Sequence, residues 1–475
     1  MAIPELCGLS LAQASRLLTT GDCSALELTE AYLARIEAVD PHINAYITVT
    51  AERALDDARR ATDAIQAGER LGTLHGIPIG LKDLYETEGI LTTGGGKFHA
   101  SHIPAADCTA ARKLREAGTV LLGKLNTHEY AYGVTTNNPH FGATHNPWDL
   151  ERIPGGSSGG SGAAIAAGLA TATLGTDTGG SIRMPASVCG AVGLKPTYGR
   201  VSKAGVIPLS YLLDHAGPIT RTVEDAAIVL GAIAGYDPLD PTTVRVPVDD
   251  YHEGLEDGVR GLRIGVPRDW FFDHLQEGVA TAIEAAIETL TLLGAEVVDV
   301  DIPGVAEGTG AILGIVLAEA QEIHAKALSE QPQDFGADVG AILGSQAPDT
   351  EDIMTAFRTR DALITTMRQV LESVDLLLTP ATPIVAAPIG QEMITYGGIE
   401  EPILAAMIRC TGPFNATGLP AISLPCGFDA DGLPVGLQLA GRPFDEALVL
   451  RAAHAYEQAT DWHLRTPELL SLIHI

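Results

Sequence analysis

Two serines and one lysine stand where acyl-transfer chemistry is possible. Ser157 lies in IPGGSSGGSGAAIAAG, residues 153–168, which holds three serines and six glycines. Ser181 follows 24 positions later in LGTDTGGSIRMPASVCG, and Lys82 precedes Ser157 by 75 positions at the end of the apolar run HGIPIGLKD. A serine hydroxyl becomes a nucleophile when a base removes its proton, and a lysine serves as that base once burial has lowered its pKa. These residue types are therefore compatible with acyl transfer at a serine, which is one of several interpretations of the glycine- and serine-rich stretch.

The glycine- and serine-rich stretch has three other interpretations. A phosphate-binding loop needs G-x-x-x-x-G-K-[ST], and no lysine stands at the required position. The nucleophile-elbow pattern G-x-S-x-G occurs at 155–159 and again at 156–160, but the preceding NPWDLERIP is a proline-broken loop where an elbow needs a strand. A purely structural turn is the default interpretation of an isolated tract of this kind. The presence of Ser181 and Lys82 elsewhere in the chain argues against that interpretation.

The elements that must position these residues alternate between helix and strand. Ser24 and Glu27 have capping-box spacing at the start of a predicted helix that ends at Asp40–Pro41, and an alanine-rich helix covers about 51–67. GIPIGLK predicts a buried strand that ends on Lys82, and CTAARKLREAG followed by TVLLGKLN predicts a helix and then another strand. This alternation predicts an α/β fold.

The segment from 155 to 200 is rich in glycine, serine and threonine, but it is interleaved with AAIAAGLA and ASVCGAVGLKP. A flexible linker lacks such apolar segments, and a disordered tract carries more charge. We therefore expect tightly packed core, in which small residues let backbones approach closely. The last five residues, SLIHI, follow a predicted helix end and are interpreted as a loose tail or a cloning remnant.

The charge balance excludes one class of partner. The 475-residue chain has 60 acidic and 30 basic residues, a net charge of −30, and no long acidic block. A surplus spread in this way indicates a soluble acidic surface, which repels phosphate backbones. We therefore expect no nucleic-acid partner.

The remaining composition indicates a cytoplasmic protein. The start MAIPELCGLSLAQ lacks a basic segment followed by a long apolar one, and no apolar run is long enough to cross a bilayer, so neither a signal peptide nor a membrane span is predicted. The cysteines form no C-x-x-C pair and have no zinc-finger spacing with histidine, which predicts a reduced setting and no metal site. They are Cys7, Cys23, Cys108, Cys189, Cys410 and Cys426.

These motifs resemble the amidase signature family of hydrolases. The resemblance takes in GIPIGLKDLYETEGILTTGG, the long stretch from GATHNPWDLERIPGGSSGGSG to GLKPTYGRVS, LDHAGPITRTVEDAA, and the late GPFNATGLPAISLPCGFDADGLPVGLQLAGRPFDE. It runs from about Gly76 to Glu446, with a divergent middle from about Asp237 to Glu372. The glycine-serine block and the downstream TDTGGSIR are highly specific to the family.

The resemblance implies a large mixed central β-sheet flanked by helices on both faces, and a Ser-Ser-Lys triad. Ser181 is then the nucleophile, Ser157 the bridging serine on a cis peptide bond with Gly156, and Lys82 the base. The backbone N–H groups of residues 178–181, Thr178, Gly179, Gly180 and Ser181, are expected to form an oxyanion hole. No cofactor or metal is implied.

The substrate pocket is harder to predict. Tyr130, Gly156, Phe414 and Asn415 are candidates for substrate binding, as is the loop GVTTNN that follows Tyr130. Asp177 and Arg183 bracket the nucleophile loop and are expected to pair and hold it. His128 and Glu129, in THEY, lack a second histidine four residues on and are interpreted as pocket lining or structure rather than a metal site.

The expected function is the hydrolysis of linear amides through an acyl-enzyme, with aryl esters and carbamates (urethanes) as further substrates. The alternative is the glutaminase (A) subunit of a tRNA-dependent amidotransferase, which passes ammonia to a partner. That subunit offers an acidic residue to the glutamine amine before NATGLP, where this chain reads AAMIRCTGPF without a carboxylate. A catalytically dead binding protein is a third hypothesis, disfavoured by the intact triad.

One domain is expected over residues 1–475. Its parts are N-terminal helices (1–70), a catalytic core with the triad (71–236), a divergent substrate-shaping region (237–372) and a return to the core (373–475). The expected partner is a small amide or related acyl substrate, and the protein is expected to be a monomer or a homodimer.

Overall fold

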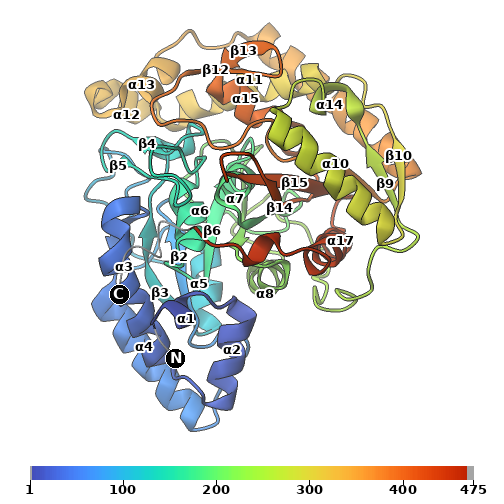
Figure 1. Cartoon of the computed structure of the whole chain (residues 1–475). Coiled ribbons are helices and arrows are strands. Elements are labelled where there is room, and N and C mark those ends of the chain that lie inside the picture. The colour runs from blue at the N-terminus through green and yellow to red at the C-terminus, as the bar shows by residue number, and fades with distance from the viewer. Residues whose placement is uncertain (1–2, 468–475) are drawn as a thin grey trace.

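A mixed sheet of 11 strands, in the order β1-β3-β2-β6-β8-β7-β14-β15-β11-β9-β10, forms the centre of the computed structural model, which describes residues 3–467 (Figure 1). The predicted tail SLIHI lies outside the described residues. Strands β2, β3 and β6 run parallel, as do β9, β10 and β11, while β8, β7, β14 and β15 join the two groups through antiparallel pairs. The predicted α/β fold with a large mixed sheet is confirmed.

The strands of this sheet are β1 Tyr46–Val49, β2 Pro78–Lys82, β3 Val120–Leu125, β6 Ala172–Asp177, β7 Val192–Lys195, β8 His215–Thr220, β9 Arg263–Val266, β10 Glu296–Asp299, β11 Leu376–Pro380, β14 Ala421–Phe428 and β15 Pro434–Ala440. Two small hairpins lie outside it, formed by β4 Asn137–Asn138 with β5 Gly142–Ala143 and by β12 Met393–Tyr396 with β13 Ile399–Pro402.

The helices are α1 Ile3–Cys7, α2 Leu11–Thr20, α3 Ala25–Ile43, α4 Ala51–Gln66, α5 Thr109–Glu116, α6 Gly159–Ala166, α7 Arg183–Cys189, α8 Val223–Ile233, α9 Arg268–Phe271, α10 Glu277–Leu292, α11 Val305–Ile323, α12 Ala325–Glu330, α13 Ala337–Leu343, α14 Thr350–Ser373, α15 Ile403–Ile408, α16 Gly412–Thr417 and α17 Glu446–Gln458. Within residues 3–467, no helix is both long and apolar enough to cross a membrane.

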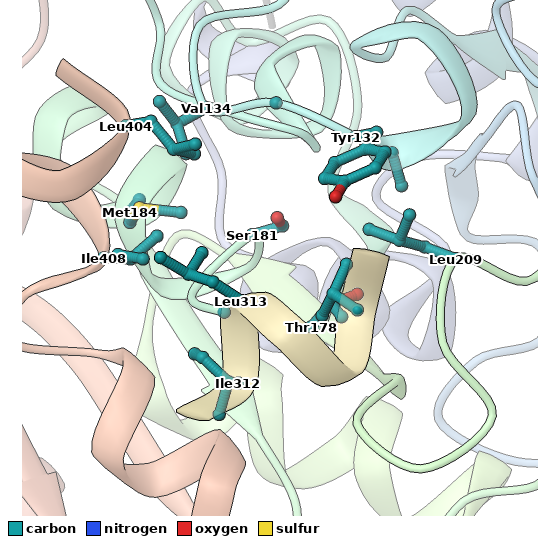
Figure 2. Close-up of a pocket in the computed structure, with 14 residues that line it drawn as sticks. Tyr132, Val134, Thr178, Ser181, Met184, Leu209, Ile312, Leu313, Leu404 and Ile408 are labelled. Atoms are coloured by element: carbon teal, nitrogen blue, oxygen red, sulfur yellow. The ribbon is translucent and has the colours of Figure 1, made fainter. Parts of the chain in front are cut away.

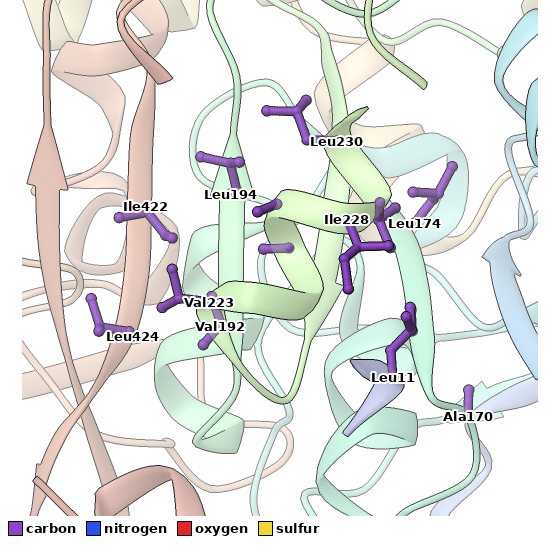
Figure 3. Close-up of a cluster of buried hydrophobic side chains, with 14 of the residues drawn as sticks. Leu11, Ala170, Leu174, Val192, Leu194, Val223, Ile228, Leu230, Ile422 and Leu424 are labelled. Carbon is purple, nitrogen blue, oxygen red and sulfur yellow. The ribbon is translucent and has the colours of Figure 1, made fainter. Parts of the chain in front are cut away.

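Helices cover both faces of the sheet. On one face, leucine, isoleucine and valine side chains of β6, β7 and β14 share a buried cluster with α8, and Figure 3 shows Val223, Ile228 and Leu230 of that helix among them. On the other face, α6 and α7 lie so close that a Cβ on Gly193 of β7 would stand 2.6 Å from the Cβ of Ala186 in α7. Small residues therefore let this second layer approach the strands that carry the site.

Two predicted helices near the N-terminus have different outcomes. The helix predicted over 51–67 is confirmed as α4, and the capping box of Ser24 and Glu27 opens α3. The predicted end of α3 at Asp40–Pro41 is wrong, because the helix includes Pro41 and continues to Ile43. The carbonyl of Asp40 accepts the N–H of Asn44 at 2.7 Å, so the turn closes beyond the proline.

The strand predicted to end on Lys82 is confirmed as β2, and the helix and strand that follow are α5 and β3. Because β2 and β6 are parallel neighbours, both deliver their last residues to the same end of the sheet. The carboxyl ends of parallel strands are the usual place for ligands in open α/β sheets. The fold therefore brings Lys82 close to the loop that follows Asp177.

Candidate active site

Lys82 is fully buried where β2 ends. Its Nζ donates hydrogen bonds to Ser157 Oγ at 2.7 Å and to Thr176 Oγ1, on the neighbouring β6, at 2.8 Å. Burial lowers the pKa of Lys82 to about 7, although the nearby carboxylates of Asp214 and Asp177 act in the opposite direction. A large fraction of this amine is therefore neutral at pH 7 and able to accept a proton.

Ser157 stands at the start of the turn that leads into α6, and its peptide bond with Gly156 is cis, as the family resemblance implies. Its Oγ accepts the hydrogen bond from Lys82, and its carbonyl accepts the N–H of His128 at 3.1 Å. A Cβ on Gly156 would stand 2.6 Å from the backbone carbon of Val134, so this position has no room for a side chain. The turn therefore holds the Ser157 hydroxyl against the amine.

Ser181 lies in the loop between β6 and α7. Its carbonyl accepts the N–H of Ser158 at 3.3 Å, which joins this loop to the segment of the bridging serine. Ser181 is 5% exposed and lines a pocket, and Figure 2 shows its hydroxyl in the middle of the lining side chains. The structure thus brings the three predicted residues together, with Ser157 on the lysine side and Ser181 on the pocket side.

The backbone of residues 178–181 offers unpaired donors beside this hydroxyl. In the described part of the chain, none of these four N–H groups donates a hydrogen bond to the protein, whereas the next N–H, that of Ile182, donates to Asp177 Oδ2 at 3.1 Å. Buried backbone N–H groups without a partner are rare. Donors arranged in this way are suited to binding the oxygen anion of a tetrahedral intermediate.

A buried ion pair fixes the same loop. The Arg183 guanidinium donates to both carboxylate oxygens of Asp177, at 2.9 and 3.0 Å, and both side chains are fully buried. Burial raises the pKa of Asp177, but the charge and hydrogen bonds of Arg183 outweigh that effect and hold the pKa below its ordinary value. Asn415 donates to the same carboxylate at 2.8 Å. The expected pairing of Asp177 with Arg183 is therefore present.

The pocket beside Ser181 is apolar. Its empty volume is about 450 Å³, counting the mouth, and within the described residues none of its lining side chains is charged. One wall comes from α11 and another from α15, both far from the triad in sequence (Figure 2). The lining residues are Ala131, Tyr132, Gly133, Val134, Thr178, Gly179, Ser181, Met184, Leu209, Ile312, Leu313, Val316, Leu404 and Ile408.

The four residues predicted to bind substrate, Tyr130, Gly156, Phe414 and Asn415, lie outside this lining. Tyr130 is buried behind it, with its ring 4.6 Å from that of His324, and Phe414 packs against Phe271 at 6.1 Å. Asn415 contacts the Asp177–Arg183 pair rather than the pocket. Gly133 and Val134, from the predicted loop GVTTNN, do line it.

The pair His128 and Glu129 forms structural contacts. His128 Nε2 lies 3.0 Å from an Asp338 oxygen, and Glu129 Oε1 lies 2.6 Å from His140 Nε2. Residues 3–467 contain no group of three or more histidine, cysteine, aspartate or glutamate side chains that could hold a metal ion. His128 therefore connects its segment to α13, and Glu129 connects it to the loop that carries His140.

Sequence reasoning missed most of the apolar lining. Ile312, Leu313 and Val316 lie on α11, and Leu404 and Ile408 lie on α15. Isoleucine and leucine on a helix are ordinarily core residues, so their types carried no functional information. The one available pointer was the position of α11 inside the divergent middle of the chain, which was expected to shape the substrate site.

A buried lysine that is hydrogen-bonded to one serine, and a second serine beside unpaired backbone donors, fit an acyl-transfer hydrolase. Comparison with known families agrees. The profile of the family called Amidase matches residues 27–450. The chain belongs to this amidase signature family and is, as predicted, an amide-hydrolysing enzyme of that family.

Relatives with a named function bear on which kind of amidase this protein is. The chain is 44% identical to proteins named as the (A) subunit of glutamyl-tRNA(Gln) amidotransferase from Chloroflexus aggregans (strain MD-66 / DSM 9485) and from Moorella thermoacetica (strain ATCC 39073 / JCM 9320), covering 98% of this chain and 99% of each relative. These names favour the alternative, a glutaminase subunit, over a stand-alone amidase.

Two solved structures share the fold. One, described as a vestigial protein complex that reveals the origins of an s-triazine catabolic enzyme, is 38% identical with a TM-score of 0.91, over 95% of this chain and 98% of that one. A bacterial aryl acylamidase of the amidase signature family is 29% identical with a TM-score of 0.88, over 98% of both chains.

Proposed function

We propose that this protein hydrolyses linear amides whose acyl group is apolar. The observation that carries the proposal is the uncharged lining of the pocket around Ser181. Transfer of an uncharged acyl chain from water into this pocket lowers the free energy of the complex. A charged group would lose its hydration in the pocket without finding a charged partner. The mostly aliphatic lining suits an aliphatic or single-ring acyl group.

The reaction follows from the order of the polar groups. Neutral Lys82 takes a proton from Ser157, which takes one from Ser181 as its Oγ forms a bond to the substrate carbonyl carbon. The N–H groups of residues 178–181 bind the resulting oxygen anion. When the carbon–nitrogen bond breaks, the proton returns from Lys82 through Ser157 to the leaving amine. Water then attacks the acyl-enzyme and gives a proton through Ser157 to Lys82. Lys82 returns that proton by the same route to Ser181 Oγ as the acid is released.

Aryl esters and carbamates belong to the same proposal. Each presents a carbonyl carbon to Ser181 and passes through a tetrahedral intermediate with the same negative oxygen. Their oxygen leaving groups are much weaker bases than the amide anion that would leave from an amide without protonation, so they depend less on the returned proton. We therefore expect aryl esters and carbamates to react as well.

The second candidate is a glutaminase subunit that works with partner proteins, and it rests on the 44% identical relatives of that name. Free glutamine carries an ammonium and a carboxylate on its α-carbon, and each needs a charged or strongly polar partner once buried. The segment AAMIRCTGPF before Asn415 has Arg409 as its only charged residue. The guanidinium of Arg409 lies over the Trp270 ring at 3.9 Å, outside the pocket lining.

A matched pair of substrates separates the two candidates. Butyryl and succinyl p-nitroanilides have acyl chains of equal carbon number, but only the succinyl chain ends in a carboxylate. We expect kcat/KM to favour the butyryl substrate by at least about a hundredfold, and Ser181→Ala to abolish turnover of both. Glutamine-dependent ammonia release without cleavage of the butyryl anilide would reject the first candidate, and co-purification with partner subunits would support the second.

We also propose that the chain works as one catalytic domain, as monomer or homodimer in the first candidate. All four predicted parts contribute strands to the large sheet: β1 from the first, β2 from the second, β9 from the third and β11 from the last. Size-exclusion chromatography with light scattering on the purified chain tests the oligomeric state. A mass that matches a complex with other proteins would favour the second candidate.

A further inference from the structure

A carboxylate outside the pocket contacts two of its walls. Asp214 directly precedes β8 and is 8% exposed. One of its oxygens accepts the Thr178 hydroxyl at 2.5 Å, and the other accepts the backbone N–H groups of Leu209 at 2.9 Å and Ser210 at 3.1 Å. Thr178 and Leu209 both line the pocket, on segments that are separate in the sequence. A single side chain therefore sets the distance between them.

The same cluster reaches a third wall. The Ser210 hydroxyl donates to a carboxylate oxygen of Glu319, on α11, and α11 carries Ile312 and Val316 of the pocket lining. The contacts run from the loop that precedes Ser181, through Asp214 and Ser210, to the helix that bounds the acyl pocket. A hydrogen-bond network of this kind holds its members more firmly than separate contacts would.

Asp214 also faces the base. Its negative charge raises the pKa of Lys82 and thus opposes the effect of burial, and Asp177 acts in the same sense. The charged groups around Asp214 itself are Lys203, which lowers its pKa against a larger raising effect of burial, and Glu319, whose own pKa is raised chiefly by burial and also by Asp214. The carboxylate is therefore coupled to both the position of the loop and the protonation of the amine.

We infer that Asp214 is a positioning residue for the reaction at Ser181: it fixes the oxyanion loop at Thr178 against the pocket wall at Leu209. This inference rests on the proposed acyl-enzyme chemistry. It predicts that replacement of the Asp214 carboxylate moves the oxyanion loop out of alignment with the substrate, although Lys82, Ser157 and Ser181 are all still present. Misplacement of reacting groups by about 1 Å lowers rates by about a hundredfold.

The test is the rate at which a fluorophosphonate labels Ser181, measured from pH 5 to pH 10. We expect Asp214→Asn to label about ten to a hundred times more slowly than wild type. We also expect the pH midpoint of labelling to fall, because removal of this negative charge leaves burial less opposed at Lys82. A purely structural role would not move this midpoint.

Asp237 provides a matched control. It is 3% exposed and accepts the hydroxyls of Thr109 and Ser202, each at 2.6 Å, and the N–H of Leu239, in a network that contains no pocket residue. Asp237→Asn is expected to keep the wild-type labelling rate and midpoint. Equal losses in the two aspartate variants would reject the inference, since a general loss of stability would then explain both.

Two variants of Thr178 keep the test decisive if Asp214→Asn fails to fold. Thr178→Val removes the hydroxyl with little change of shape and is expected to slow labelling of Ser181. Thr178→Ser keeps a hydroxyl for the Asp214 carboxylate and is expected to label faster than Thr178→Val. Labelling of Thr178→Val at the wild-type rate would overturn the inference. If wild-type protein is not labelled at Ser181 at all, the proposed function itself fails and the inference falls with it.

Discussion

Alanine at Gly180 is expected to lower activity far more than alanine at Gly179. Gly180 has φ +137°, and a Cβ there would stand 2.2 Å from the Thr411 hydroxyl oxygen and 2.7 Å from the Thr411 Cβ. Neither contact is tolerable, so the loop must move away from Thr411. At Gly179 the nearest atom to an added Cβ is Ile408 Cγ2 at 3.5 Å, an ordinary contact. The two substitutions add the same methyl group one residue apart.

The expected magnitude follows from the donors in this loop. Movement at Gly180 displaces its own N–H and that of Ser181, and the loss of one oxyanion donor costs about 3–4 kcal/mol, or about a hundred- to a thousandfold in kcat. Gly180→Ala should also lower the free energy of unfolding by about 1–3 kcal/mol, because of the strained φ and the overlap with Thr411. Gly179→Ala is expected to keep kcat within about threefold, because its methyl group meets only ordinary contacts.

The assay is steady-state hydrolysis of the butyryl anilide, with thermal unfolding by circular dichroism to confirm that each variant is folded at the assay temperature. Both kcat and KM are needed, because the added methyl at Gly179 lies in the pocket lining and is expected to change KM for the larger acyl groups. A folded Gly180→Ala enzyme with wild-type kcat would refute the assignment of this loop as the oxyanion hole. So would a Gly179→Ala enzyme that loses as much kcat as Gly180→Ala.

Four other results follow from the buried groups. Because burial lowers the pKa of Lys82 to about 7, kcat/KM should rise with pH through about 7 and then level off, which a pH–rate profile measures. Ser157→Ala, which removes the proposed proton relay, should lower kcat by at least about a thousandfold. In the unfolded state Lys82 keeps its proton up to the ordinary lysine pKa of 10.5. The free energy of unfolding should therefore rise with pH between about 7 and 10, by about 1.4 kcal/mol per pH unit from this group. Urea unfolding of Lys82→Met at several pH values should show that this contribution to the pH slope is lost. Arg183→Met leaves Asp177 charged and unpaired in the core and should destabilise the fold by about 3–5 kcal/mol, whereas a melting temperature equal to wild type would contradict the buried pair.

The proposed catalytic centre could be predicted because short, specific motifs around its residues resemble those of the amidase signature family. Few side chains other than Lys82, Ser157 and Ser181 satisfy a base, a relay and a nucleophile, and the glycines around them mark close backbone contacts. The strand that ends on Lys82 was also predictable, because an apolar run bounded by glycine and a charged residue is typical of a buried strand. These features lie within single short segments.

The acyl pocket was not predictable, because it depends on contacts between distant segments. Ile312 of α11 and Ile408 of α15 meet Ser181 only after the sheet and the outer helices have assembled. The strand order also depends on contacts between distant segments. Strands β14 and β15 lie between β7 and β11 in the sheet, although both follow β11 in the sequence. The end of α3 was misplaced because hydrogen bonds beyond Pro41 extended the helix, and proline alone gives no information on such contacts.

The division of the site between sheet and outer helices has an evolutionary consequence. The reacting groups sit at strand ends and in tight glycine turns, where almost any replacement is damaging, while the outer wall of the acyl site consists of aliphatic side chains on α11 and α15. Aliphatic residues exchange for one another at small cost in stability. Substitutions in α11 and α15 can therefore change the substrate specificity of later members of this lineage. The proposed catalytic residues need not change.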